Sequence, residues 1–312
     1  MRTREYLMLF TLALIWGASF FFIKIGLRDL APASLVVGRL AGSVVVLGAI
    51  AAARPAWFTG WWRYWRLIVV LAVANYLIPY LLIAWGETRI ASGLASIFNA
   101  TTPLFTVVLA SQWRGAGREP LTAQRVAGVL LGFIGVAVLV GPAVLGTVGD
   151  SLPGILGEAA VLIAAASYGV GALVSRSFRG APRLVGPLGS QLAALVMTLP
   201  VAAVWSPPTR LPGLPALGAV LELGVFGTAV AFLLFFWLVN HVGSTRASIV
   251  TYLLPCTALL WGALLLGEPV TWFAIAGLAL VLLGSVITNG TLNGLFTRAT
   301  AARERTPASE AA

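Results

Sequence analysis

The stretch YLMLFTLALIWGASFFFIKIGL, residues 6–27, carries a single charged residue, Lys24, over a length that can cross a bilayer as a helix. Crossing the hydrocarbon core takes about 20 apolar residues. Arg2 and Arg4 precede the run as they would in a signal peptide, but no clean small-residue cleavage site follows before the next apolar run. We therefore expect a retained first transmembrane helix.

Similar apolar runs continue along the chain. Hydrophobic residues make up 59% of the sequence and charged residues 10%, and the mean hydropathy is +0.96. A soluble globule needs more charge on its surface, and only helices satisfy the backbone of such runs in lipid. The sequence predicts an all-α integral membrane fold with ten transmembrane helices. The runs lie near residues 6–27, 33–52, 67–86, 90–112, 125–140, 154–174, 186–205, 216–239, 246–266 and 272–288.

Several kinds of chemistry are disfavoured by composition. With Cys256 as the one cysteine and His241 as the one histidine, the chain offers neither a disulfide framework nor a metal cluster nor a Ser-His-Asp triad. No Walker A pattern is present. The net charge of +10 is scattered between apolar runs and forms no nucleic-acid patch. We expect no enzymatic activity, no metal, no cofactor and no nucleic-acid partner.

The basic residues predict the orientation. Of the 20 lysines and arginines, three lie in loops on one side (Arg28, Arg89 and Arg210), and Lys24 and Arg39 lie within spans. The other fifteen lie on the side of the N-terminus. Because cytoplasmic loops are enriched in lysine and arginine, we expect both termini in the cytoplasm and the protein in the cell (inner) membrane.

The two halves of the chain repeat one another at an offset of 152 residues. Trp16-Gly17 falls on Tyr168-Gly169, and Lys24 falls on Arg176. After a slip of three residues, Glu119-Pro120-Leu121-Thr122 matches Glu268-Pro269-Val270-Thr271. Each half has five spans, an odd number, so the second half enters the membrane from the opposite side. We predict two inverted-topology five-helix repeats, residues 1–144 and 145–290, followed by a polar tail at 291–312.

These motifs are similar to those of the EamA family, ten-helix members of the drug/metabolite transporter superfamily. The similarity rests on the run WGASFFFIK at residues 16–24, the doubled E-P-[LV]-T turn with its following G-x6-G, and VGSTRASIVTYLLP at residues 242–255. It covers about residues 6–288. The resemblance implies a secondary transporter that works by alternating access, in many members an exporter of amino acids or related metabolites.

A polar stripe in the fourth span suggests a transport cavity. Ser92, Ser96, Asn99, Pro103 and Thr106 step by three or four residues and share one helical face. The repeat places Ser244, Ser248, Thr251 and Pro255 on the equivalent face of the ninth span. The serines are equally compatible with close helix packing. Asn99 costs more to bury in lipid and favours a cavity.

Aromatic and amide residues at mid-span extend this prediction. Trp16 and Tyr168 occupy equivalent positions in the two repeats. Asn75 lies four residues before Pro79, and this proline frees a backbone carbonyl. Packing or lipid contact is the competing role for each ring. Our predicted substrate-binding set is Trp16, Asn75, Tyr80, Asn99, Tyr168, Ser248 and Tyr252.

Three charged residues inside spans are candidates for coupling or gating. Lys24 and Arg39 lie toward the external side, where a structural ion-pair cluster is the alternative. Glu222 lies about two turns into the eighth span. Burial favours the protonated form of a carboxyl group, so Glu222 is a candidate proton carrier; the alternatives are binding of a substrate amine and pairing with Arg39 or Arg210.

Together these features predict a secondary active transporter whose partners are a small-molecule substrate, the lipid bilayer and protons as a candidate coupling ion. The favoured activity is export of amino acids or related small metabolites. An exporter of drugs or other amphipathic compounds is the alternative within transport. A membrane-embedded enzyme or a non-transporting sensor is the alternative from another class. The oligomeric state stays open at this stage.

Overall fold

All regular structure in the described residues of the computed structural model is helical. These residues are 3–113, 122–144, 152–205, 211–242, 247 and 250–288. Seven helical stretches there are long and apolar enough to cross a membrane, and three shorter apolar helices accompany them. The shorter three are Ala123–Leu139, Val250–Leu266 and Trp272–Thr288.

The first half begins with two uninterrupted helices, α1 (Thr3–Gly26) and α2 (Pro32–Ala53). The next stretch is divided into η1 (Pro55–Trp57), η2 (Trp61–Tyr64), α3 (Trp65–Ala72), the π-helical η3 (Val73–Leu77) and α4 (Ile78–Glu87). It is followed by α5 (Ser92–Asn99), α6 (Thr102–Gln112) and α7 (Ala123–Val144).

The second half has a similar order of elements. It begins with α8 (Leu152–Ser175), η4 (Arg176–Phe178) and α9 (Val185–Trp205). The next stretch consists of α10 (Leu214–Leu221), the π-helical η5 (Glu222–Val230) and α11 (Ala231–Val242), and it is followed by α13 (Val250–Leu266) and α14 (Trp272–Thr288).

Prolines explain two of the irregular stretches. Pro79 has no N–H to donate to the carbonyl of Asn75, and the backbone there shifts to π-type bonding, in which Ile78 N–H bonds the carbonyl of Val73. Pro103 likewise cannot bond the carbonyl of Asn99, and the Thr102 hydroxyl donates to it instead at 2.8 Å. Both irregularities therefore lie next to an asparagine that the sequence singled out.

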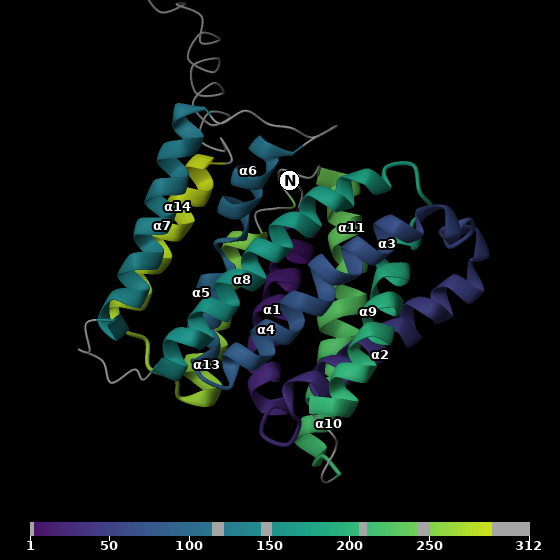
Figure 1. Cartoon of the computed structure of the whole chain (residues 1–312), viewed down its shortest axis with the longest axis horizontal. Helices are drawn as coiled ribbons and strands as arrows, with labels where there is room; N and C mark the ends of the chain where they lie inside the picture. Colours follow the sequence, from purple (N-terminus) through teal and green to yellow (C-terminus); the bar gives the residue numbers. More distant parts are fainter. Residues whose placement is uncertain are drawn as a thin grey trace, which may run out of the picture.

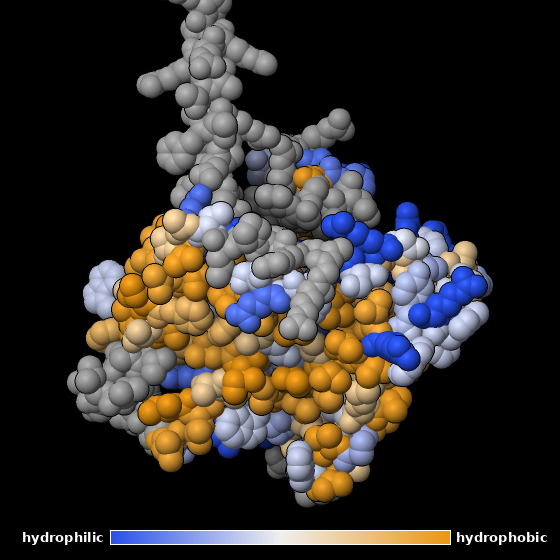
Figure 2. Space-filling view, turned by 45° about the horizontal axis from the view of Figure 1, so that its top comes forward, coloured by the Kyte–Doolittle hydropathy of each residue, from blue (hydrophilic) through white to orange (hydrophobic). Residues whose placement is uncertain are grey.

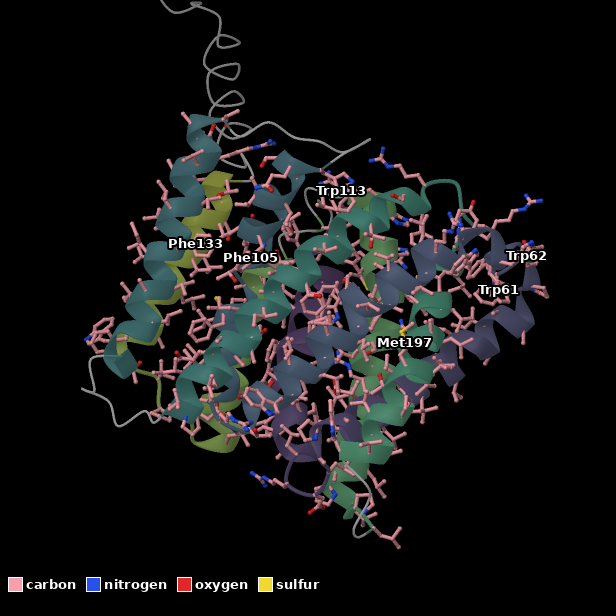
Figure 3. All side chains as sticks on the ribbon, in the orientation of Figure 1. Trp61, Trp62, Phe105, Trp113, Phe133 and Met197 are labelled. Carbon is pink, nitrogen blue, oxygen red and sulfur yellow. The ribbon has the colours of Figure 1, made fainter. Side chains whose placement is uncertain are left out.

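The helices form one bundle with α7 and α14 side by side at one edge (Figure 1). Glycines allow this pair to approach closely: a methyl group at Gly135 would lie 2.9 Å from the carbonyl oxygen of Gly277. Phe105 of α6 and Phe133 of α7 point toward one another with ring centroids 5.4 Å apart, and so join this edge to the rest of the bundle (Figure 3).

The outside of the bundle is apolar. Hydrophobic side chains cover most of the flank in Figure 2, and the most hydrophilic ones gather along its upper and right-hand edges. Leu130 of α7, Val196 of α9 and Leu264 of α13 are each at least 60% exposed. Such surface is stable only against lipid. Trp61 and Trp62, exposed at the far end of the bundle in Figure 3, suit a membrane–water interface.

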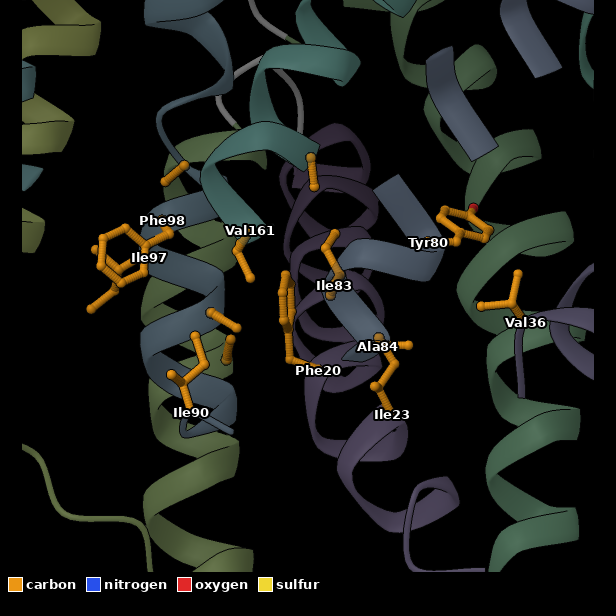
Figure 4. Close-up of a cluster of buried hydrophobic side chains, with 14 of the residues drawn as sticks. Phe20, Ile23, Val36, Tyr80, Ile83, Ala84, Ile90, Ile97, Phe98 and Val161 are labelled. Atoms are coloured by element: carbon orange, nitrogen blue, oxygen red, sulfur yellow. The ribbon is translucent and has the colours of Figure 1, made fainter. Parts of the chain in front are cut away.

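A second apolar layer lies inside. Phe20 projects from α1 toward Val161 of α8 on one side and Ile83 of α4 on the other (Figure 4). Residues of α1, α2, α4, α5 and α8 contribute to the same buried cluster. Because this cluster joins helices from both halves, it holds the central helices around the space described next.

Candidate functional site

A cavity of about 350 Å³ lies between the two halves of the bundle. Its wall is mostly aromatic and aliphatic, with few polar groups, as in many sites for small molecules. Six residues that the sequence predicted for binding, coupling or gating line it: Trp16, Arg39, Asn75, Tyr80, Asn99 and Tyr168. The other lining residues are Ser19, Phe20, Ile23, Ile83, Ala100, Thr102, Pro103, Ala172, Gly227, Thr228, Phe232, Phe235, Thr251 and Leu254.

Arg39 is the charged residue on this wall. Its guanidinium carbon lies 3.9 Å from the centre of the Tyr80 ring, and its Nε donates to the Thr228 hydroxyl at 3.0 Å. The Thr228 hydroxyl in turn donates to the carbonyl of Leu223 at 2.7 Å. These contacts fix the plane of the guanidinium, and within the described residues its two terminal nitrogens have no hydrogen-bond partner. They are available to a bound anion, which a guanidinium holds in a bidentate geometry.

Asn99 provides a second polar group. Its Oδ1 is buried and has no hydrogen-bond partner among the described residues, although the residue lies on the cavity wall. A buried amide oxygen without a donor costs about 1–3 kcal/mol. A donor group of a bound molecule would remove that cost. The asparagine therefore suits an N–H or O–H group of a ligand.

Aromatic rings form much of the remaining wall. The Trp16 and Phe235 rings lie 5.5 Å apart, and Tyr80 packs edge-on against Tyr76 at 5.6 Å. Asn75, within the π-helical η3, lies close to Gly171 of α8, where a methyl group would come 2.7 Å from its Oδ1. The wall offers broad apolar faces to an organic side chain and, at Arg39 and Asn99, hydrogen-bonding groups to a polar end.

The other predicted residues lie elsewhere. Tyr252 is not on the cavity wall, and its hydroxyl donates to the carbonyl of Ser285 in α14 at 3.4 Å. Its neighbour Thr251 lines the cavity instead, because consecutive helical residues point about 100° apart. Ser248 falls outside the described residues. Lys24 lines a different pocket, together with Glu87 and Glu268.

Glu222 lies just behind the wall. It is half-buried at the start of η5, its Oε2 has no hydrogen-bond partner in the described part of the chain, and Arg39 is the basic residue that acts on it electrostatically. A methyl group at Gly227, a lining residue, would lie 3.6 Å from this oxygen. The carboxyl is therefore one small residue away from the cavity.

Four lining residues of η5 and α11 were not predicted from the sequence: Gly227, Thr228, Phe232 and Phe235. The offset of 152 residues could have found two of them, because Gly227 and Phe232 correspond to Asn75 and Tyr80, which the sequence predicted for binding. Phe235 corresponds to Ile83, which lines the cavity but was not predicted. Thr228 corresponds to Tyr76, whose role in packing against Tyr80 is visible only in the structure.

A protein family matches both halves of the chain. A family model described as the EamA-like transporter family matches residues 3–141 and again residues 155–290. An uncharacterized transporter of Archaeoglobus fulgidus is 25% identical over 293 residues, which cover 91% of this chain and 98% of that protein. The uncharacterized inner membrane transporter YedA of Escherichia coli is 27% identical over 86% of this chain and 85% of its own length.

One relative has a more specific name. A probable terminal-alkyne amino-acid exporter of Streptantibioticus cattleyicolor is 26% identical over 88% of this chain and 89% of its own length. The fold is also similar to that of a protein solved by crystallography, with a TM-score of 0.65 at 20% identity, covering 95% of this chain and 99% of the other. These relatives are named as transporters or exporters, and YedA is named as an inner membrane transporter.

Proposed function

Because the chain belongs to the EamA-like transporter family, we propose that it is a secondary active transporter that exports amino acids or related small metabolites by alternating access. The observation that carries the proposal is the cavity between the halves, where the Arg39 guanidinium and the unpartnered amide oxygen of Asn99 lie on a mostly apolar wall. A ligand with its carboxylate on Arg39 and an apolar side chain against the aromatic wall would use both the guanidinium and the apolar surface of the cavity.

The proposal includes ten spans arranged as two inverted repeats. Several pairs of lining residues are related by the offset of 152 residues, which supports a cavity on the pseudo-two-fold axis. These pairs are Trp16 and Tyr168, Phe20 and Ala172, Asn75 and Gly227, Tyr80 and Phe232, Ile83 and Phe235, Asn99 and Thr251, and Thr102 and Leu254.

Helix packing supports the same arrangement. In the repeat, α1 corresponds to α8, and α13 corresponds to the stretch formed by α5 and α6. The contact of α1 with α13 therefore corresponds to the contact of α8 with α5 and α6. The contact of α4 with α8 corresponds to that of α11 with α1, whereas the contact of α7 with α14 maps onto itself. The family model also matches the chain twice, once in each half. We further propose cytoplasmic termini in the inner membrane, from the arginine distribution.

The charge of the cavity distinguishes two substrate classes. A cationic amphipathic drug, the alternative substrate, would have to bind beside the Arg39 guanidinium, where like charges repel. An amino acid would place its carboxylate on Arg39 and its ammonium group toward Glu222, which lies behind Gly227. The zwitterion therefore fits both charged groups, and we favour amino acids over cationic drugs.

The binding experiment is a thermal-shift screen of purified protein with amino acids, their amides and amphipathic cations. We expect amino acids with apolar side chains to raise the Tm of the parent, and their amides to be weaker ligands. Replacing Arg39 by glutamine, the residue at the equivalent position 191, should remove about 1.5–3 kcal/mol of binding, which is about ten- to hundredfold in Kd. The control is Arg63→Gln, which changes an exposed arginine outside the cavity. Selective stabilisation by cations that survives Arg39→Gln would refute the assignment.

A further inference from the structure

A second pocket, of about 370 Å³, lies where the ends of α1, α4 and α13 meet. None of its lining residues lines the substrate cavity. Four of them are charged: Lys24, Arg28, Glu87 and Glu268. Such a concentration of charge is unusual in a chain with 10% charged residues.

Two of these side chains clamp the turn that joins α4 to α5. The Lys24 ammonium, from α1, donates to the carbonyls of Glu87 at 2.6 Å and Ile90 at 2.8 Å. A cation in this position stabilises the C-terminal end of α4. The clamp therefore joins α1 to the turn without involving the carboxyl group of Glu87.

Glu268 holds the other end of the same turn. Its carboxylate accepts from Ser92 N–H at 2.8 Å, from the Ser92 hydroxyl at 2.8 Å and from Gly93 N–H at 3.1 Å. Gly267, with φ +66°, places it there by ending α13 in a left-handed conformation. Three donors at the N-terminus of α5 therefore hold this carboxylate in place.

The carboxyl group of Glu87 has very different surroundings from that of Glu268. The residue is completely buried, and neither carboxyl oxygen has a hydrogen-bond partner in the part of the chain that the structure describes. A buried carboxylate without donors is costly. The charged groups that act on it are Lys24 from α1, Arg39 from α2 and Glu268, which follows α13. Of the two acids in the pocket, Glu87 is the one that suits a proton.

We propose that Glu87 is a proton-binding site that controls the clamp at this end of the transporter, an inference that rests on the proposed carrier function. With the proton bound, Glu87 is neutral and Lys24 stays on the carbonyls of Glu87 and Ile90. When the proton leaves for water in the pocket, the new carboxylate attracts the Lys24 ammonium away from those carbonyls. The turn at Ile90 then loses its contact with α1, while Lys24 stays paired with Glu87 at the end of α4.

The test measures the distance between α1 and the turn. Spin labels replace the exposed Arg28 and Arg89 in a Cys256→Ser background, in the full chain in lipid. In this parent, the ratio of a long to a short distance should rise about tenfold per pH unit over the titration range, as expected for one linked proton. In Glu87→Gln the short distance should persist at every pH. Glu87→Asp keeps a titrating group, so it should keep the pH response.

The matched control is Glu158→Gln, because Glu158 is another buried acid, at the start of α8 and outside the pocket. The Glu158→Gln variant should show the same dependence of the label distance on pH as the parent. A parent distance that ignores pH, a pH response that survives in Glu87→Gln, or one that is lost in both Glu87→Asp and Glu158→Gln would overturn the proposal. Amino-acid exchange measured on the same samples keeps the two proposals apart. Exchange without a pH response refutes the clamp alone, whereas a clamp that responds without any amino-acid exchange refutes only the substrate.

Discussion

At the scale of single residues, the site depends on polar groups that the protein itself leaves without partners. Arg39 is held by Tyr80 and Thr228 yet keeps its terminal nitrogens for a ligand, and the amide oxygen of Asn99 has no donor. In a membrane, such groups persist where a substrate or water completes them. Asn99, which the sequence singled out for its cost in lipid, and Arg39, a charged residue inside a span, both lie on the cavity wall.

Glu222 is the candidate carrier of the coupling proton. If it carries the coupling proton, Glu222→Gln should abolish accumulation driven by a proton gradient while downhill exchange of substrate continues, because glutamine can bind but cannot titrate. The measurement compares driven and exchange transport in the same proteoliposomes. Glu158→Gln, which changes a buried acid away from the cavity, should leave both kinds of transport intact.

The rival account of Glu222 is a static ion pair with Arg39. It predicts reduced expression of Glu222→Gln, with the remaining transport keeping its normal pH dependence. Driven transport that is unchanged in the variant would eliminate the coupling role.

At the scale of helices, the close contact between α7 and α14 requires glycine at particular positions. Gly135→Ala in α7 should lower stability by about 1–3 kcal/mol, because the added methyl group would lie 2.9 Å from the carbonyl of Gly277 and from Leu280 Cβ. Gly218→Ala in α10 is the control, since nothing lies within 4 Å of its added methyl group. Alanine there should be neutral or slightly stabilising. Thermal unfolding in detergent compares the two, and equal Tm changes would contradict this account of the α7–α14 contact.

The sequence predicted the all-helical class and the position of each apolar run, because length and hydropathy alone decide which segments cross lipid. Six residues of its predicted site lie together on the cavity wall: Trp16, Arg39, Asn75, Tyr80, Asn99 and Tyr168. Rotation about a helix axis separates two of its candidates: Thr251, on the polar stripe of the ninth span, lines the cavity, and its neighbour Tyr252 does not. The sequence prediction missed Glu87, since an acid at the end of a span is usually solvated and its complete burial depends on helices distant in sequence.

At the scale of the whole molecule, the inverted repeat predicts opposite locations for two neighbouring loops. Reporter fusions after Gly149 and after Gly180 should be external and cytoplasmic respectively, because the helix between them, α8, would cross the membrane. The arginines at 176, 179 and 183 favour the cytoplasmic assignment of the second loop. Activity of both fusions on one side of the membrane would rule out the proposed topology.

The claim that unites these scales is that the chain is a carrier whose single central cavity opens to each side in turn. Counterflow tests it most directly. Proteoliposomes loaded with an unlabelled apolar amino acid are diluted into a trace of the labelled one. We predict a transient accumulation of label above equilibrium, because a carrier exchanges inside for outside substrate through one site, and its loss in Arg39→Gln. Across a panel of amino acids, entry of label no faster than into protein-free vesicles, or entry without any overshoot, would contradict the account.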